Sequence, residues 1–224
     1  MKMKTGIVMV TLMASFLVWA AGHAASGSSS GSKGKSGNAQ YKYEADMEPT
    51  IVAPGTAPVA PDAEGEAKYR KQIQKGTIKT ERFEATVKIP IPSPTLGITD
   101  EGSAKNADIQ VLLSSATAPT TAYAACALDF TEIDSELEDD STKTYAVYKV
   151  DVRKELRNSS YRQRQIHGAC DINPATTQID NGTPAPVEND IATAVLVNTT
   201  PPVAPATTAT VTLISIIAGP FEID

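Results

Sequence analysis

Side chains able to do catalytic chemistry are scarce in this sequence. Its two histidines are His23, just after an N-terminal apolar run, and His167. A histidine–serine or histidine–cysteine pair in the rest of the chain would have to use His167. Strand alternation places His167 opposite Ile166 and Cys170, so we expect it to face solvent. A lone histidine does not make a zinc site of the usual kind, and we predict no catalytic residue, no metal and no cofactor.

The two cysteines, Cys126 and Cys170, have the pattern of a disulfide pair. Cys126 shares its strand face with Ala124 and Leu128, and Cys170 is in phase with Ile166, so both cysteines are expected to face the core. A bridge between them would close a loop of about 45 residues, which the chain-entropy relation equates with roughly 4 kcal/mol of stability. The alternative is two separate buried thiols that pack as small apolar groups.

An acidic stretch and a basic cluster flank the strand expected at 144–153. Residues 134–141 are expected to form a solvated hairpin tip, and calcium binding is the alternative, although the glycine turn and ligand spacing of an EF-hand are missing. The basic cluster surrounds the next turn and could hold a sulfated or phosphorylated ligand; otherwise it pairs with neighbouring acids. Its candidate ligand-binding members are Arg153, Arg157, Arg162 and Arg164.

The first 25 residues match a secretory signal peptide. Lys2 and Lys4 precede an apolar run over 6–21, and small residues follow it, so we expect cleavage after Ala24 or Ala25. An uncleaved membrane anchor is the alternative, but a run of roughly 16 residues is shorter than a spanning helix needs. The protein is therefore expected to be secreted, periplasmic or on the cell surface, with no transmembrane segment after signal cleavage.

Residues 26–62 are predicted to be a flexible tether. Glycine, serine and lysine dominate its first part, and proline and alanine dominate 49–61, which favours an extended linker. Within this stretch, 40–47 alternates weakly and could form a short strand. The folded domain is predicted to span 63–224.

The remaining chain alternates apolar and polar residues, as half-buried strands do. Residues 64–74 are an exception, because Tyr69 and Ile73 are spaced as on one helix face, so a short helix is expected there. Residues 211–217 are apolar at nearly every position, which predicts a strand covered on both faces. Turn signals favour an antiparallel β-sandwich of about seven or eight strands, with Greek-key connections and one internal disulfide; a barrel is the second architecture. The expected strands are 76–91, 107–114, 124–130, 144–153, 161–172, 191–197 and 206–218, with 40–47 as a further candidate.

The charge balance narrows the choice of partners. The chain has 20 Lys and Arg against 26 Asp and Glu, a net charge of −6. Loss of Lys2 and Lys4 with the signal leaves 18 against 26, or −8. An acidic chain with no large basic stripe in its sequence is a poor candidate for binding nucleic acid, so we expect an unidentified protein or surface ligand instead.

Three functions are compatible with these features. A secreted or cell-surface β-sandwich with a non-catalytic binding or structural role is favoured, because an export signal accompanies a shortage of catalytic groups. A second hypothesis is a subunit of an extracellular filament in which 40–47 pairs with a neighbour's edge strand. A third is a carboxylate-dependent enzyme, because pairs of carboxylates have no spacing signature in a sequence.

Overall fold

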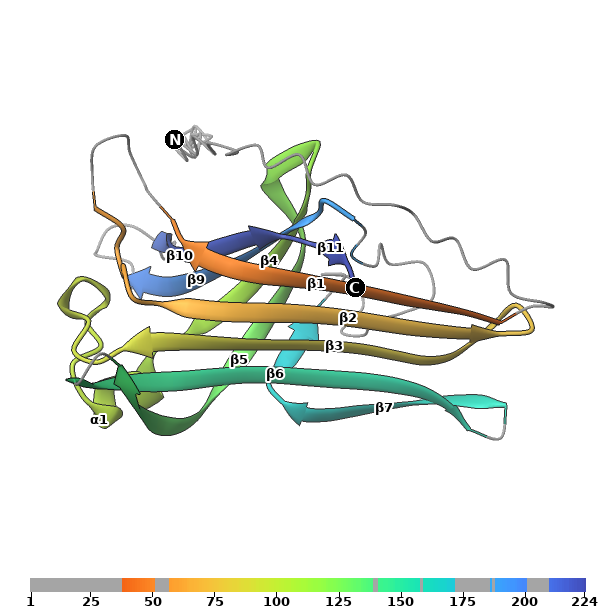
Figure 1. Ribbon diagram of the computed structural model, residues 1–224, viewed down its shortest axis with the longest axis horizontal. Coiled ribbons are helices and arrows are strands. Elements are labelled where there is room, and N and C mark those ends of the chain that lie inside the picture. The colour runs from red at the N-terminus through yellow and green to blue at the C-terminus, as the bar shows by residue number, and fades with distance from the viewer. Residues whose placement is uncertain are drawn as a thin grey trace, which may run out of the picture.

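The computed structural model describes residues 38–50, 57–138, 141–157, 159–171, 186, 188–200 and 210–224. These residues form an antiparallel β structure, as the sequence predicts, and they include one short α-helix that was not predicted (Figure 1). The elements are β1 (Asn38–Pro49), β2 (Glu64–Gln74), β3 (Thr77–Pro90), η1 (Pro94–Leu96), α1 (Glu101–Asn106), β4 (Ile109–Ser115), β5 (Ala118–Glu138), β6 (Ser141–Arg157), β7 (Ser160–His167), β8 (Ala169–Asp171), β9 (Ile191–Thr200), β10 (Thr210–Pro220) and β11 (Glu222–Ile223).

The strands form two layers, and long strands run from one layer into the other. The hydrogen-bonded order is β7-β6-β3-β2-β1-β10-β9-β4-β5-β8, and β5 also pairs with β6, so the ladder returns from the second layer to the first. In Figure 1, β1, β2, β3, β6 and β7 form the front layer, and β4 and β5 cross behind it. Strands that pass from one layer to the other make the corners of such an arrangement. Here β5 and β1 do so, since β5 pairs with β4 and then β6, and β1 pairs with β2 and β10.

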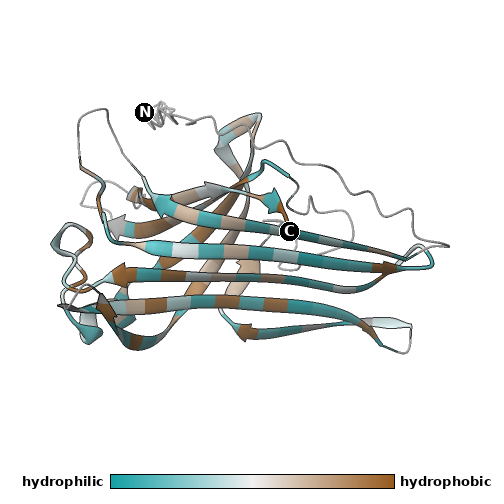
Figure 2. Cartoon of the chain, in the orientation of Figure 1, coloured by the Kyte–Doolittle hydropathy of each residue, from teal (hydrophilic) through white to brown (hydrophobic). Residues whose placement is uncertain are grey.

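The core lies between the two layers and follows the predicted alternation. On β3, Phe83, Val87 and Ile89 are buried, and Ile109 and Val111 are buried on β4. Apolar and polar residues alternate along the front strands in Figure 2. Each strand with this alternation therefore turns its apolar side chains to the interior and its polar side chains to solvent.

Two strands differ from the expected burial. β6 is buried on both faces from Tyr145 to Tyr148, although simple alternation would leave Tyr145 and Val147 on the solvent side. The Lys88 ammonium lies 5.9 Å from the centre of the Tyr145 ring and helps to cover it. On β10, Val211 and Leu213 are exposed, so the prediction of a strand covered on both faces is wrong for this half. At these positions β10 pairs with β9, and its pairing with β1 begins only further along, at Ile217.

The predicted helix at 64–74 is wrong, because this segment is β2. A spacing of four places Tyr69 and Ile73 on one face of a helix, but it also places them on one face of a strand. Pairing decides between the two: β2 bonds to β1 on one side and β3 on the other over nearly its whole length. Ala67 and Tyr69 are buried, and the charged residues beside them, Glu66, Lys68 and Arg70, lie on the other face of the strand.

β1 lies inside the stretch that the sequence assigned to the tether. The strand prediction for 40–47 is confirmed, and the strand is longer, from Asn38 to Pro49. Ala45 and Met47 are buried in the core, and Tyr43 packs against it. β1 is thus a central strand that pairs with β2, β10 and β11 of its own chain.

The disulfide between Cys126 and Cys170 is confirmed. The two residues are direct cross-strand partners on β5 and β8, with their Cα atoms 3.9 Å apart. Both side chains are buried. The bond fastens the three-residue strand β8 to the second layer, and it joins positions separated by 44 residues along the chain.

Gly168 interrupts the strand that was expected to run through 161–172. The pairing of β5 with β6 begins at Asp129 and Lys149; on the other side of that point β6 pairs with β7 and β5 pairs with β8. Gly168 sits where the two layers diverge, with φ +60°, and its N–H donates to Asp129 Oδ2 at 2.6 Å. The bend changes the phase of alternation. Ile166, expected to point inward with Cys170, is therefore 45% exposed.

Candidate functional site

A row of basic residues crosses the outer face of the front layer. Direct cross-strand partners are Lys42 with Arg70, Arg70 with Arg82, Arg82 with Arg153, and Arg153 with Arg164. These five residues, here the basic row, come from β1, β2, β3, β6 and β7. Directly opposed residues of an antiparallel ladder point to the same side of the sheet. The residues adjacent in sequence, such as Tyr69, Phe83 and Val152, are buried, so the basic row faces outward.

This row is not an arrangement that sheet stability favours. Like charges directly opposite each other on a sheet destabilise it, whereas opposite charges contribute roughly 0.2–1 kcal/mol per pair. The neighbouring row has the more usual mixture of signs and is here called the mixed row: Glu44, Lys68, Glu84, Asp151 and His167. An uninterrupted row of cations therefore needs anions beside it or above it.

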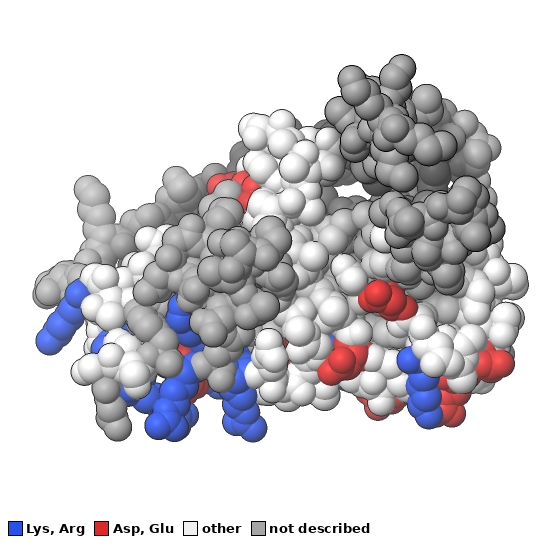
Figure 3. Space-filling view, turned by 180° about the vertical axis from the view of Figure 1, so that it is seen from behind, with Lys and Arg blue, Asp and Glu red and all other residues white. Residues whose placement is uncertain are grey.

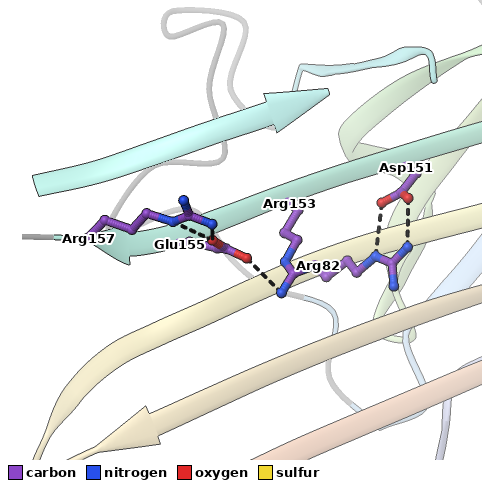
Figure 4. A network of polar contacts seen from close by, with 5 residues as sticks. All are labelled: Arg82, Asp151, Arg153, Glu155 and Arg157. Carbon is purple, nitrogen blue, oxygen red and sulfur yellow. Dashed lines mark hydrogen bonds and ion pairs between the residues drawn. The ribbon is translucent and has the colours of Figure 1, made fainter. Parts of the chain in front are cut away.

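Carboxylates at the sides hold part of the basic row in place (Figure 4). Arg82 makes a two-pronged contact with Asp151, with Nε at 3.0 Å from Oδ1 and Nη2 at 2.7 Å from Oδ2. The same Nη2 lies 2.8 Å from Glu84. These contacts fix the plane of the Arg82 guanidinium, since a forked donor bound at two points cannot rotate freely.

On the other side of the row, the Glu155 carboxylate binds the guanidinium of Arg153. It lies 2.6 Å from Arg153 Nη2 and 2.8 Å from Arg157 Nη2. The hydrogen bond from Arg157, followed by the charge of Arg153, holds the pKa of the Glu155 carboxyl below its usual value. Arg157 and Arg153 are therefore joined through one carboxylate, as the dashed lines of Figure 4 indicate.

The guanidiniums of Arg70 and Arg164 are exposed to solvent. Within the described parts of the chain, neither Arg70 nor Arg164 makes an ion pair, and Lys42 contacts Asp224 at 3.2 Å. A shallow hollow of about 190 Å³ lies over the middle of the row. It is lined by Gln40, Arg70, Lys71, Gln72, Thr80, Arg82 and Arg153. The hollow thus combines fixed and free guanidiniums with neutral hydrogen-bonding groups.

The structure separates the four arginines that the sequence grouped. Arg153 and Arg164 belong to the basic row. Arg162 is the cross-strand partner of Glu155 in the next row, and Arg157 binds Glu155. Sequence reasoning missed Lys42, Arg70 and Arg82, which complete the row from β1, β2 and β3. Lys154, between Arg153 and Arg157 in the sequence, is buried on the opposite face of β6, where it is paired in register with Glu81.

The other sequence candidates lie elsewhere. His167 is half-buried in the mixed row as the cross-strand partner of Asp151. In the acidic stretch 134–141, Glu136 forms an ion pair with Lys88, and residues 139 and 140 lie outside the described residues. In the part of the chain that the structure describes, no three His, Cys, Asp or Glu side chains are grouped so as to hold a metal ion.

Three tyrosines, of which Tyr69 and Tyr148 are buried and Tyr123 is partly buried, are bound to protein groups. The Tyr69 hydroxyl donates to buried Glu81, Tyr123 donates to Asp190 at 2.9 Å, and Tyr148 donates to the Ala104 carbonyl at 2.9 Å. Burial is the largest cause that raises the pKa of all three, aided by the nearby carboxylate at Tyr69 and Tyr123. For Tyr148 the pKa rises to about 12. These groups hold the interior together, since a buried hydroxyl with a partner avoids a desolvation cost.

No protein-family model, curated protein or solved structure matches this chain. The helix α1 is six residues long, and among the described residues there is no helix with the length and apolar character needed to cross a membrane.

Proposed function

We propose that this protein is an extracytoplasmic, non-catalytic binding protein that holds an anionic ligand on the basic row. One observation carries the proposal: four arginines and a lysine from five strands stand in register on one solvent-facing surface. A guanidinium presents its donors as a planar fork that matches carboxylate, sulfate and phosphate groups. A bound anion would supply the charge that the row lacks.

The distribution of charge over the molecule supports this. In residues 38–42, 70–82, 153–157 and 159–164, all described, the only acids are Glu81 and Glu155. Figure 3 shows the molecule from behind, opposite the face that carries the basic row, and on this side too most visible Lys and Arg lie at one end and most Asp and Glu toward the other. An acidic protein with a local basic surface attracts anions to that surface and keeps its remaining surface soluble. The basic residues of these four segments are Lys42, Arg70, Lys71, Lys75, Lys79, Arg82, Arg153, Lys154, Arg157, Arg162 and Arg164.

Export is the second part of the proposal. The first 25 residues have the order of a secretory signal, and the disulfide fits an oxidising compartment, where such bonds persist. Mass spectrometry of the exported protein tests this part. A mature chain that begins at Ala25 or Ser26 supports it, and an intact Met1 in the final product argues against it.

Binding of dextran sulfate, with uncharged dextran as the reference polymer, tests the anion site. The double variant Arg70→Gln/Arg164→Gln removes the two open guanidiniums and leaves no carboxylate without its partner. We expect it to lose about tenfold in affinity, since each exposed charge contact contributes up to about 1 kcal/mol.

The matched control is Lys105→Gln/Lys149→Gln. It makes the same change in net charge at two exposed ion pairs away from the basic row, Lys105 with Glu101 and Lys149 with Glu132. We expect its affinity for dextran sulfate to stay within about twofold of the wild type. An equal loss in both double variants would show that net charge alone governs binding, and the proposed site would then be wrong.

A further inference from the structure

We infer that the ligand is a single linear acidic polysaccharide that lies along the basic row, across the strands. This rests on the proposed function and adds the class of ligand. The row is long and narrow, and both dimensions restrict what can occupy it.

The length of the row favours a polymer with regularly spaced charges. Neighbouring strands lie about 4.8 Å apart, so the five positions from Lys42 to Arg164 span about 19 Å. A ligand that contacts all of them needs an anionic group at about each interstrand spacing. One pyranose ring with its glycosidic oxygen is of comparable length, so a polymer with one carboxylate or sulfate per sugar meets this requirement.

The width of the row favours a single chain. On one side lies the mixed row, where Glu44, Glu84 and Asp151 would repel a second line of anions. Residues that face the same way along a strand recur about every 7 Å, so these carboxylates stand close to the row. On the other side lie Gln40, Gln72 and Thr80, which line the hollow. Their amide and hydroxyl groups suit the neutral hydroxyls of a sugar.

Two other linear acids fit less well. An extended acidic peptide presents side chains on one face about every 7 Å, which does not match the interstrand spacing of about 4.8 Å. A single nucleic-acid strand is usually held by aromatic side chains that stack on its bases. The basic row, the mixed row and the neighbouring positions Gln40, Gln72, Thr80, Glu155 and Arg162 contain no Phe, Tyr or Trp.

The experiment is a calorimetric titration of the mature protein with galacturonate oligomers of one to eight sugars. Affinity is expected to rise about twofold to fivefold with each added sugar and to level off at about five sugars. For the variant Arg164→Gln, at the edge strand β7, the affinity should level off at a shorter oligomer. Arg70→Gln, within the row, should weaken binding of every oligomer longer than two sugars. Thermal unfolding of both variants checks that they are folded.

Three results would overturn the inference. The first is affinity that does not depend on oligomer length. The second is tighter binding of polyglutamate or of a single-stranded oligonucleotide than of a galacturonate oligomer with the same number of charges. The third is equal binding of uncharged cello-oligosaccharides. If dextran sulfate still distinguishes the Arg70→Gln/Arg164→Gln variant from its control, the anion site stands and only the class of ligand is wrong.

Discussion

Gly168 provides a sharp test of how the two layers are joined. It stands where β7 ends and β8 begins, with φ +60°, a conformation that side-chain-bearing residues rarely adopt. A Cβ atom placed on it would lie 2.2 Å from the Ala127 carbonyl oxygen and 3.2 Å from Val150 Cβ. Substitution with alanine therefore combines backbone strain with a steric clash against β5.

The two costs can be separated with matched glycines. Gly76 has φ +73°, and a Cβ atom placed on it would have nothing within 4 Å, so Gly76→Ala carries the strain alone, about 1–2 kcal/mol. At Gly219 a Cβ would lie 1.8 Å from the Asp46 carbonyl oxygen without a positive φ, so Gly219→Ala carries the clash alone. Overpacking costs about 1–3 kcal/mol, so Gly168→Ala, which combines both costs, should lose about 2–5 kcal/mol.

Urea-induced unfolding of the wild type and the three variants measures these differences. The midpoint should fall most for Gly168→Ala and least for Gly76→Ala. A loss of that size is a large part of a typical unfolding free energy of about 5–15 kcal/mol. If Gly168→Ala were as stable as Gly76→Ala, the close approach of Gly168 to β5 would be wrong, and so would the account of how β7 and β8 fit between β5 and β6.

Two further predictions concern the covalent bond and the buried hydroxyls. The variant Cys126→Ala/Cys170→Ala should lose about 2–5 kcal/mol in the same urea experiment, because the bond closes a long loop in the unfolded chain; a loss below about 1 kcal/mol would contradict this. Tyr69, Tyr123 and Tyr148 have a higher pKa in the folded protein than in the unfolded chain. The stability linked to this difference is fully present below the unfolded tyrosine pKa of about 10. It is lost as the pH rises through the folded pKa values. Tyrosinate absorbance of these residues should therefore appear together with unfolding as the pH is raised, and ionisation of every tyrosine in the folded protein near pH 10 would refute the burial.

Period-two alternation was enough to predict much of the fold. It predicted the strand at 76–91, which carries the buried Phe83 and Val87, and it put Cys126 on a buried face, because one buried sheet face forces every second residue to be apolar. It failed where the local pattern fits two structures. Tyr69 and Ile73 share a face in a helix and in a strand, and only pairing with β1 and β3 decides between them. It also failed at Gly168, where a bend between two sheets changes the phase.

The basic row could not be predicted from the sequence. Arg70 and Arg82 lie on either side of the turn at Lys75 and Gly76, and a register shift at Ile73 prevents a simple count across the hairpin. Arg153 joins them from β6, which is distant in sequence. The sequence indicated a basic cluster near Arg153 and Arg164, but charge along a chain does not state which residues face each other across strands.

The central claim, that the basic row holds an anion, is tested most directly by the arginine side-chain NMR signals of the protein during titration with a galacturonate pentamer. The Nε–Hε signals of Arg70, Arg82, Arg153 and Arg164 should shift together and saturate at one ligand per chain. In the Arg70→Gln variant the remaining three should shift only at higher ligand concentration. Unchanged signals for Arg70 and Arg82 while the pentamer binds would place the ligand elsewhere and contradict the account.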